Sequence, residues 1–296
     1  MTSKTQLTLF FFCFLFSLPQ ISFSQTRDTL VERLIRENGI QSRECYNTVI
    51  FDGKLSPLSL LTAKTSFDSL GRPLNYTTYA DSSEVSSFLV YFYDDNNNLV
   101  KVENRFKDEF NNQTVFFEYN ERGLRSRERT VFEGKTNGEM NYIYNEMDLL
   151  QERKIEFFDT KKGRKQSVLY EYNQKNQLVK TTFNTHIRDV LEQEYDAEGN
   201  VSRVYHFPRK KSKVLFSKRE YDEYKQVILR KDHAYRSQNK FDGINNIYIQ
   251  KGDISIIKTE YFENGLIANE TEWLNDVLVS FREFEYLKKP SKSTNN

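Results

Sequence analysis

The stretch Tyr119-Asn120-Glu121-Arg122-Gly123-Leu124 contains the pattern that decides the fold. An Asn side chain bonds backbone two residues further on and so opens a type I turn. Gly123 can adopt left-handed backbone without steric cost, and such a residue after a type I turn restores the twist of the flanking strands. Leu124 then starts a second strand. The stretch therefore predicts a β-hairpin.

The same pattern occurs eight times, with an aromatic anchor at residues 67, 93, 119, 144, 172, 195, 221 and 261. The spacing is close to 26 residues except for the last interval of 40, which includes Tyr235 to Asp253 and predicts a degenerate hairpin or a longer loop there. Asp or Asn follows the anchor in seven copies, and the fourth residue after the anchor is Gly, Asn or Asp in seven. The predicted turn residues are Asp68, Gly71, Asp94, Asn97, Asn120, Gly123, Asn145, Asp148, Asn173, Asn176, Asp196, Gly199 and Gly265.

Aromatic residues also recur two positions before the anchor, and Phe284 with Tyr286 repeats this spacing near the C-terminus. Because side chains of a strand alternate between faces, the two rings of each pair lie on one face. Stacked hairpins would then build an aromatic ladder along the sheet. Its predicted members are Tyr91, Tyr93, Phe117, Tyr119, Tyr142, Tyr144, Tyr170 and Tyr172.

The Tyr-Asp-x-x-Gly-x-Leu pattern resembles the YD repeat of the RHS-repeat family, over residues 46–286. The last copy, Tyr261 to Leu266, is also similar to the MORN-type variant of antitoxin-like repeat proteins. The resemblance implies a strip of hairpins, which spirals into a hollow cocoon in large members that end in a toxin. This chain has eight copies, no Asp-Pro pair and only ten residues after Tyr286. We therefore expect an all-β fold: one elongated, twisted, open antiparallel sheet with a short N-terminal helix, and no toxin activity.

Both ends of the chain differ from the repeats. Lys4, the apolar run Leu7 to Leu18 and the small residues around Phe23 predict a secretory signal peptide over residues 1–24, with an uncleaved membrane anchor as the alternative. Cys13 lacks the small neighbours of a lipoprotein signal. Residues 25–45 are expected to form a short helix (Thr29 to Asn38) and a lead-in strand that cap the array, and residues 287–296 a disordered tail. The protein is accordingly expected to be secreted or periplasmic, with no transmembrane segment after signal removal.

Charge and composition exclude some functions. The 296 residues include 43 basic and 42 acidic ones, and the predicted signal peptide carries one of the basic residues. A balanced chain lacks the basic excess that nucleic-acid binding needs. Aromatic residues make up 15% of the chain, which argues against disorder. Cys45 is the single cysteine after signal removal and predicts a small, half-buried strand residue.

No residue pattern predicts a catalytic, cofactor or metal site. His186, His206 and His233 lie far apart in sequence and are interpreted as surface strand residues. Asp94 to Asn98 resembles the start of a calcium loop, but Leu99 and Arg105 occupy the positions of its glycine and glutamate, so a hairpin turn is favoured. The basic run Arg209 to Lys213 predicts an exposed loop, with contact to an acidic polymer or lipid headgroups as the alternative. Trp273 predicts packing at the C-terminal end, with a carbohydrate platform as the alternative.

These observations favour a non-enzymatic exported repeat protein that binds or scaffolds an unknown protein or a cell-envelope polysaccharide. The alternative is an immunity or antitoxin-like protein that neutralises a toxin, suggested by the MORN-like copy.

Overall fold

The computed structural model describes residues 30–80, 83–107, 112–158, 164–184, 188–208, 213–234, 238–241, 246–250 and 252–288. The predicted signal peptide, His186 and most of the basic run lie outside these residues. One helix, α2 (Leu30–Glu37), precedes the strands. The strands are β1 (Ile40–Phe51), β2 (Lys54–Phe67), β3 (Pro73–Tyr79), β4 (Val85–Tyr93), β5 (Leu99–Phe106), β6 (Gln113–Tyr119), β7 (Arg125–Phe132), β8 (Lys135–Tyr144), β9 (Leu150–Phe157), β10 (Arg164–Tyr172), β11 (Leu178–Asn184), β12 (Arg188–Tyr195), β13 (Val201–Pro208), β14 (Val214–Tyr221), β15 (Val227–His233), β16 (Gln238–Phe241), β17 (Asn246–Ile249), β18 (Ile254–Tyr261), β19 (Ile267–Leu274) and β20 (Val277–Lys288).

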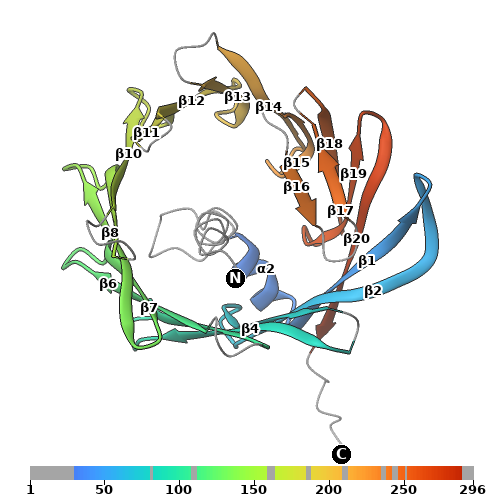
Figure 1. The fold of residues 1–296 in the computed structure, drawn as a ribbon, viewed down its shortest axis with the longest axis horizontal. Coiled ribbons are helices and arrows are strands. Elements are labelled where there is room, and N and C mark those ends of the chain that lie inside the picture. The colour runs from blue at the N-terminus through green and yellow to red at the C-terminus, as the bar shows by residue number, and fades with distance from the viewer. Residues whose placement is uncertain are drawn as a thin grey trace, which may run out of the picture.

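Eighteen of these strands form a closed antiparallel barrel (Figure 1). Each strand pairs with the next along the chain, β15 pairs with β18, and β20 pairs with β1. The β20–β1 register runs from Ile40 opposite Lys288 to Asn47 opposite Arg282. The expectation of an open strip is therefore wrong. The accumulated twist and tilt of the hairpins bring the last strand back to the first, and closure removes both sheet edges, whose backbone groups would otherwise lack partners.

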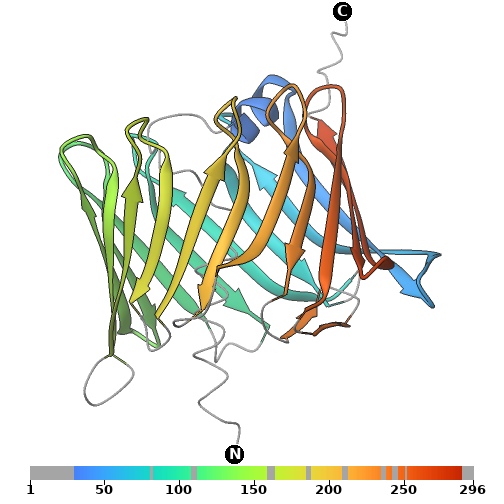
Figure 2. The same cartoon turned by 90° about the horizontal axis from the view of Figure 1, so that it is seen from above.

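Two segments depart from the regular wall. Strands β16 and β17 pair only with each other and form a small separate hairpin within the long interval of the repeat. The β1–β2 hairpin is longer than the others, and its tip extends beyond the barrel (Figure 2). Strand β1 begins before the predicted repeat domain, and β20 continues two residues beyond Tyr286. No helix in the described segments is long and apolar enough to cross a membrane.

The register defines which side chains share a face, because residues paired between strands point to the same side. One row of partners runs from Tyr91 through Val102 to Val115. A second row runs from Phe117 through Glu128, Met140 and Ile155 to Gln166. Since residues two apart on a strand also share a face, both rows and all eight predicted ladder residues lie on one side of the sheet.

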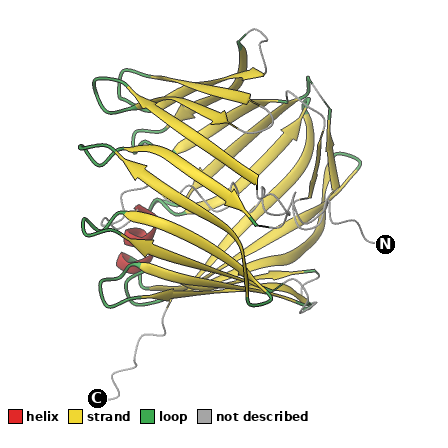
Figure 3. Ribbon diagram, turned by 60° about the vertical axis from the view of Figure 1, so that its left-hand side comes forward, coloured by secondary structure: helices red, strands yellow, loops and turns green. Residues whose placement is uncertain are grey.

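This shared side faces the interior of the barrel. Helix α2 packs on it through Leu34 and Ile35, which share a hydrophobic cluster with the anchor Phe67 and with Tyr286. The helix lies inside the ring of strands, near the rim that carries the hairpin turns (Figures 1 and 3). We call this side the inner wall.

A barrel of eighteen strands is expected to be wider than its side chains can fill. Barrel diameter grows with strand number, and side chains fill the interior of barrels of roughly 8 strands but leave a channel at about 16–18. The hydrophobic residues accordingly form separate clusters along the wall: one around Leu89, Val102, Val115 and Phe117, and another around Met140, Tyr142 and Leu150. Each cluster joins neighbouring strands of a single layer.

The opposite side of the sheet faces outward and carries charges at alternate positions. Ion pairs cross or follow the strands there, such as Lys64–Glu44 (2.7 Å), Lys101–Glu103 (2.9 Å), Lys180–Glu171 (2.7 Å) and Lys258–Glu260 (2.5 Å). Phe92 lies on this side with the Lys101 ammonium 3.7 Å from its ring centre. This surface is typical of a wall in contact with water.

Candidate functional site

The eight predicted turns share one geometry. The fourth residue after each anchor has a positive φ, from 60° to 85°, and its amide donates to the carbonyl of the residue that follows the anchor. The strand pairing shifts register at the anchor, just before each turn, as between Phe92 and Tyr93. Lys225 has φ 63° although it belongs to none of the residue types that tolerate this backbone easily. The turn geometry is therefore set by the whole pattern and not by this position alone.

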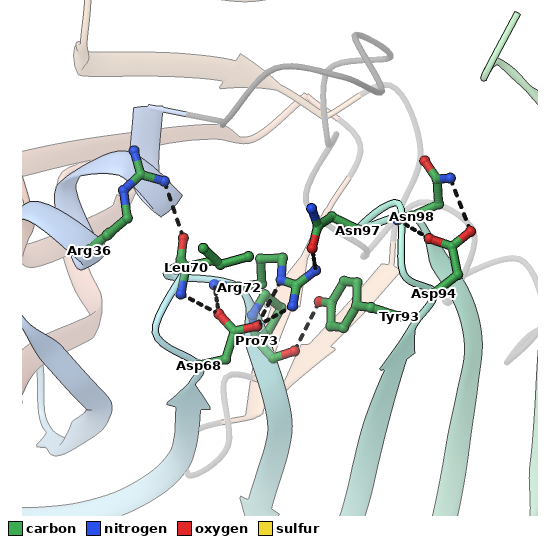
Figure 4. Close-up of polar contacts among 9 residues, drawn as sticks. All are labelled: Arg36, Asp68, Leu70, Arg72, Pro73, Tyr93, Asp94, Asn97 and Asn98. Atoms are coloured by element: carbon green, nitrogen blue, oxygen red, sulfur yellow. Dashed lines mark hydrogen bonds and ion pairs between the residues drawn. The ribbon is translucent and has the colours of Figure 1, made fainter.

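The residue after the anchor closes the turn through its side chain. Asp68 Oδ1 accepts hydrogen bonds from the amides of Leu70 and Arg72, both at 2.9 Å (Figure 4). Asn145 Oδ1 accepts from Met147 and Leu149 in the same way. In the last copy Phe262 has no such group, and Asn264 Oδ1 accepts from Leu266 instead.

The anchor tyrosines link neighbouring hairpins through their hydroxyl groups. Tyr93 donates to the carbonyl of Pro73 at 2.9 Å (Figure 4), and Tyr119 donates to that of Leu99 at 2.8 Å. In each case the acceptor is the first residue of the neighbouring barrel strand that precedes the tyrosine's own strand. The remaining bonds of this kind are Tyr144 to Arg125, Tyr172 to Leu150, Tyr195 to Leu178, Tyr221 to Val201, Tyr261 to Val227 and Tyr286 to Ile267.

Helix α2 joins the first and last turns of the array. A Cβ atom on Gly71 would lie 2.2 Å from the Glu32 carbonyl oxygen, so the first turn approaches the helix backbone closely. Arg36 donates to the carbonyl of Leu70 at 3.4 Å (Figure 4). At the other end, Leu34 lies against Gly265, and Asn264 donates to Asn38 at 3.3 Å. The helix therefore spans the seam where β20 meets β1.

A row of arginine and tyrosine side chains crosses the inner wall on β7 to β10. Tyr142 donates a hydrogen bond to Glu128 at 2.8 Å, and Arg125 lies 3.8 Å from the same carboxylate. Arg153 pairs with Tyr142 across β8 and β9, and its guanidinium lies 5.4 Å from the Tyr170 ring centre. Nearer the start of β10, Arg164 is paired with Phe157, and its guanidinium lies 4.8 Å from the Phe157 ring centre.

Burial shifts the titration of this row. It raises the pKa of Tyr142 well above the ordinary value, and the Glu128 carboxylate adds to that effect. It also raises the pKa of Tyr170 to about 12, although the Arg153 charge opposes the rise. These tyrosines stay protonated near neutral pH. The Tyr142 hydroxyl donates to Glu128, whereas the Tyr170 hydroxyl accepts a hydrogen bond from Arg153.

The inner wall carries a second polar region on β12 to β20. Ser217 donates to Asp232 at 2.6 Å, Arg230 lies 3.0 Å from the same carboxylate, and Ser255 donates to Glu272 at 2.8 Å. His206 is 3% exposed and lies 3.3 Å from Asp189. The interpretation of His206 as a surface residue is therefore wrong, because the inward position on β13 was not visible from sequence.

Other sequence candidates are placed as follows. Asp94 accepts from the Asn98 amide at 2.8 Å within a hairpin turn. Cys45 is half-buried on β1, and burial raises the pKa of its thiol. Lys213 pairs with Glu192 and Glu194 at 3.4 and 3.7 Å. Trp273 lies on β19 opposite Leu278. Within the described segments, no group of three His, Cys, Asp or Glu side chains is placed to hold a metal ion.

Sequence reasoning missed the arginine–tyrosine row and the hydroxyl bonds of the anchors. The hydroxyl bonds had a visible signal in the sequence. The anchor is tyrosine in seven of eight copies, although turn geometry and stacking require only an aromatic ring. The arginine row had no such signal, because the inward face is defined only by closure.

Comparison with known proteins gives no family. No family model matches the chain, and no curated protein matches it. Among solved structures, a porin-like protein from Bacteroides uniformis is 10% identical with a TM-score of 0.43, over 85% of this chain and 97% of that chain. The structures of TcdB2-TccC3-Cdc42 and TcdB2-TccC3 are 14% and 11% identical, with TM-scores of 0.30 and 0.31. They match 82% and 72% of this chain, which spans only 11% and 12% of theirs. At these TM-scores no property of those proteins is transferred, and the resemblance to the YD-repeat family rests on the sequence motif.

Proposed function

We propose that this chain is a non-enzymatic, exported binding protein that holds a polysaccharide against the inner wall of its barrel. The observation that carries the proposal is the chemistry of that wall. Aromatic rings alternate there with hydroxyl, amide and guanidinium groups, and most of the rings are half-buried and not fully covered. Sugar rings present both apolar C–H faces and hydroxyl groups, so a wall of this kind matches them on both counts.

The outward surface supports a barrel with water on both sides. Its ion pairs occur at alternate positions along the strands, and each Lys or Arg on a lipid-facing strand would cost about 2–4 kcal/mol at the centre of a bilayer. A ligand in solution can then reach the interior from the rim.

Hydroxyl-radical footprinting with a panel of polysaccharides tests the proposal. Bound glycan is expected to protect the inner residues Tyr91 and Tyr170, whereas Phe92 and Phe116 on the outward side should react as in the free protein. Protection confined to the outward side, or no binding across neutral and acidic glycans, would refute the proposal.

A further inference from the structure

The inner wall of β7 to β10 carries an excess of positive charge. By register its charged residues are Arg125, Glu128, Lys135, Arg153 and Arg164, which gives a net charge of three positive units. The outward face of β7 to β10 instead carries equal numbers of basic and acidic residues: Arg127, Arg129, Lys154 and Lys165 with Glu139, Glu152, Glu156 and Glu171. Over the same four strands the outward face is therefore neutral, whereas the inner wall is positive.

The inner arginines also differ from the outer lysines in their partners. Lys154 lies 3.7 Å from Glu152 and Lys165 lies 3.2 Å from Glu156. Within the described residues, neither Arg153 nor Arg164 has a carboxylate oxygen within 4.0 Å, and the Nε of each is buried without a hydrogen-bond partner. Both guanidinium groups lie against aromatic rings, and Arg153 also hydrogen-bonds the Tyr170 hydroxyl. These neutral partners orient the arginines without neutralising their charge.

The spacing of the two arginines favours a polymer over a small anion. Arg153 is opposite Val168 and Arg164 is opposite Phe157, so the two positions are four residues apart along β10. That separation corresponds to about 13 Å at the rise of a strand. A single small anion would contact one guanidinium, whereas a chain with repeated acidic groups can contact both.

We infer that Arg153 and Arg164 bind an acidic polysaccharide through its carboxylate groups, with the half-buried Tyr170 ring beside Arg153 as a surface for the sugar. A guanidinium offers paired N–H donors that match a carboxylate in a bidentate arrangement. The inference rests on the proposed function and names the chemical class of its ligand.

The test uses the full chain and two double variants that change adjacent residues on opposite faces. Arg153→Gln with Arg164→Gln alters the inner wall, and Lys154→Gln with Lys165→Gln is the matched control. Binding of polygalacturonate is measured by calorimetry at low and moderate salt, with dextran as the neutral glycan. Circular dichroism of both variants checks that the barrel is intact.

The inner double variant is expected to lose at least about tenfold in affinity for polygalacturonate, and the outer one to stay within about twofold. Equal losses in both variants, or none in either, would overturn the inference. If dextran and polygalacturonate bind equally well and the arginine substitutions change neither affinity, the inference is overturned but the proposed function still holds. If poly-glutamate or single-stranded DNA binds more tightly than polygalacturonate and this binding depends on the two arginines, the inference of a glycan ligand is overturned in favour of an acidic peptide or a nucleic acid.

Discussion

The hydroxyl group of each anchor tyrosine makes the bond that connects one hairpin to the next. We predict that Tyr144→Phe lowers the free energy of unfolding by about 1 kcal/mol, because it leaves the Arg125 carbonyl without this donor. Tyr224→Phe is the matched control, since Tyr224 is 73% exposed in a turn. Urea denaturation of both variants measures the difference, and equal midpoints would show that the hydroxyl bond is energetically silent.

Lys225 occupies a backbone conformation that glycine adopts more easily. A side chain in left-handed backbone costs about 1–2 kcal/mol, part of which is offset by the larger entropy of an unfolded glycine. We therefore expect Lys225→Gly to stabilise the protein by about 0.5–1 kcal/mol in thermal or urea unfolding. A loss of stability would mean that the Lys225 side chain makes a contribution that the turn geometry does not reveal.

The buried tyrosines predict the behaviour of the barrel at high pH. Burial raises the pKa of Tyr91, Tyr144 and Tyr170 to about 12, from 10 for an exposed tyrosine. Their contribution to stability is fully present below pH 10 and is lost as the pH rises towards 12, because unfolding then releases protons. Melting temperatures measured from pH 8 to 12 should fall steeply above pH 10; a flat profile would contradict the burial of these rings.

Helix α2 is the element that ties the two ends of the repeat array together. Gly71 and Gly123 have similar φ values, 82° and 73°, but only Gly71 lies against the helix. We expect Gly123→Ala to cost about 1 kcal/mol from backbone strain alone. Gly71→Ala should cost more, because its Cβ would overlap the Glu32 carbonyl, and the helix must move away.

Amide hydrogen exchange distinguishes the effects of the two glycine substitutions on helix α2. The amides of residues 33–37 should exchange faster in Gly71→Ala than in Gly123→Ala. Equal exchange would show that the first turn does not hold the helix.

At the level of elements, the hairpins, their turns and the short helix followed from sequence, since each depends on residues within about ten positions of one another.

Closure of the barrel can be tested with the cysteine that the protein already has. Cys45 on β1 is paired with Phe284 on β20, and paired residues lie within the Cα distance that a disulfide spans. In a Cys13→Ser background, Phe284→Cys should form an intramolecular disulfide on mild oxidation. Leu169→Cys on β10 should not, and disulfide-linked dimers of the Phe284→Cys variant would indicate an open sheet.

Closure was the part of the fold that the sequence did not predict. The hairpin motif constrains neighbouring strands, whereas closure depends on tilt and twist summed over the whole array. A signal was nevertheless present at the two ends. Neither β1 nor β20 carries proline or the dense lysine content that protects a sheet edge, and Phe284 with Tyr286 repeats the interior spacing. The arginine row could not be predicted because its inward direction follows from closure.

The antiparallel β20–β1 seam restricts how this protein can change in size. Neighbouring strands must run in opposite directions all the way around, so a closed wall of this kind needs an even number of strands. Loss or gain of one strand would force a parallel pair at the seam. The smallest permitted step is a whole two-strand repeat of about 26 residues, gained or lost together with its turn. The number of strands in barrels built from this repeat should therefore vary in steps of two, and each step should add or remove one Tyr-Asp turn.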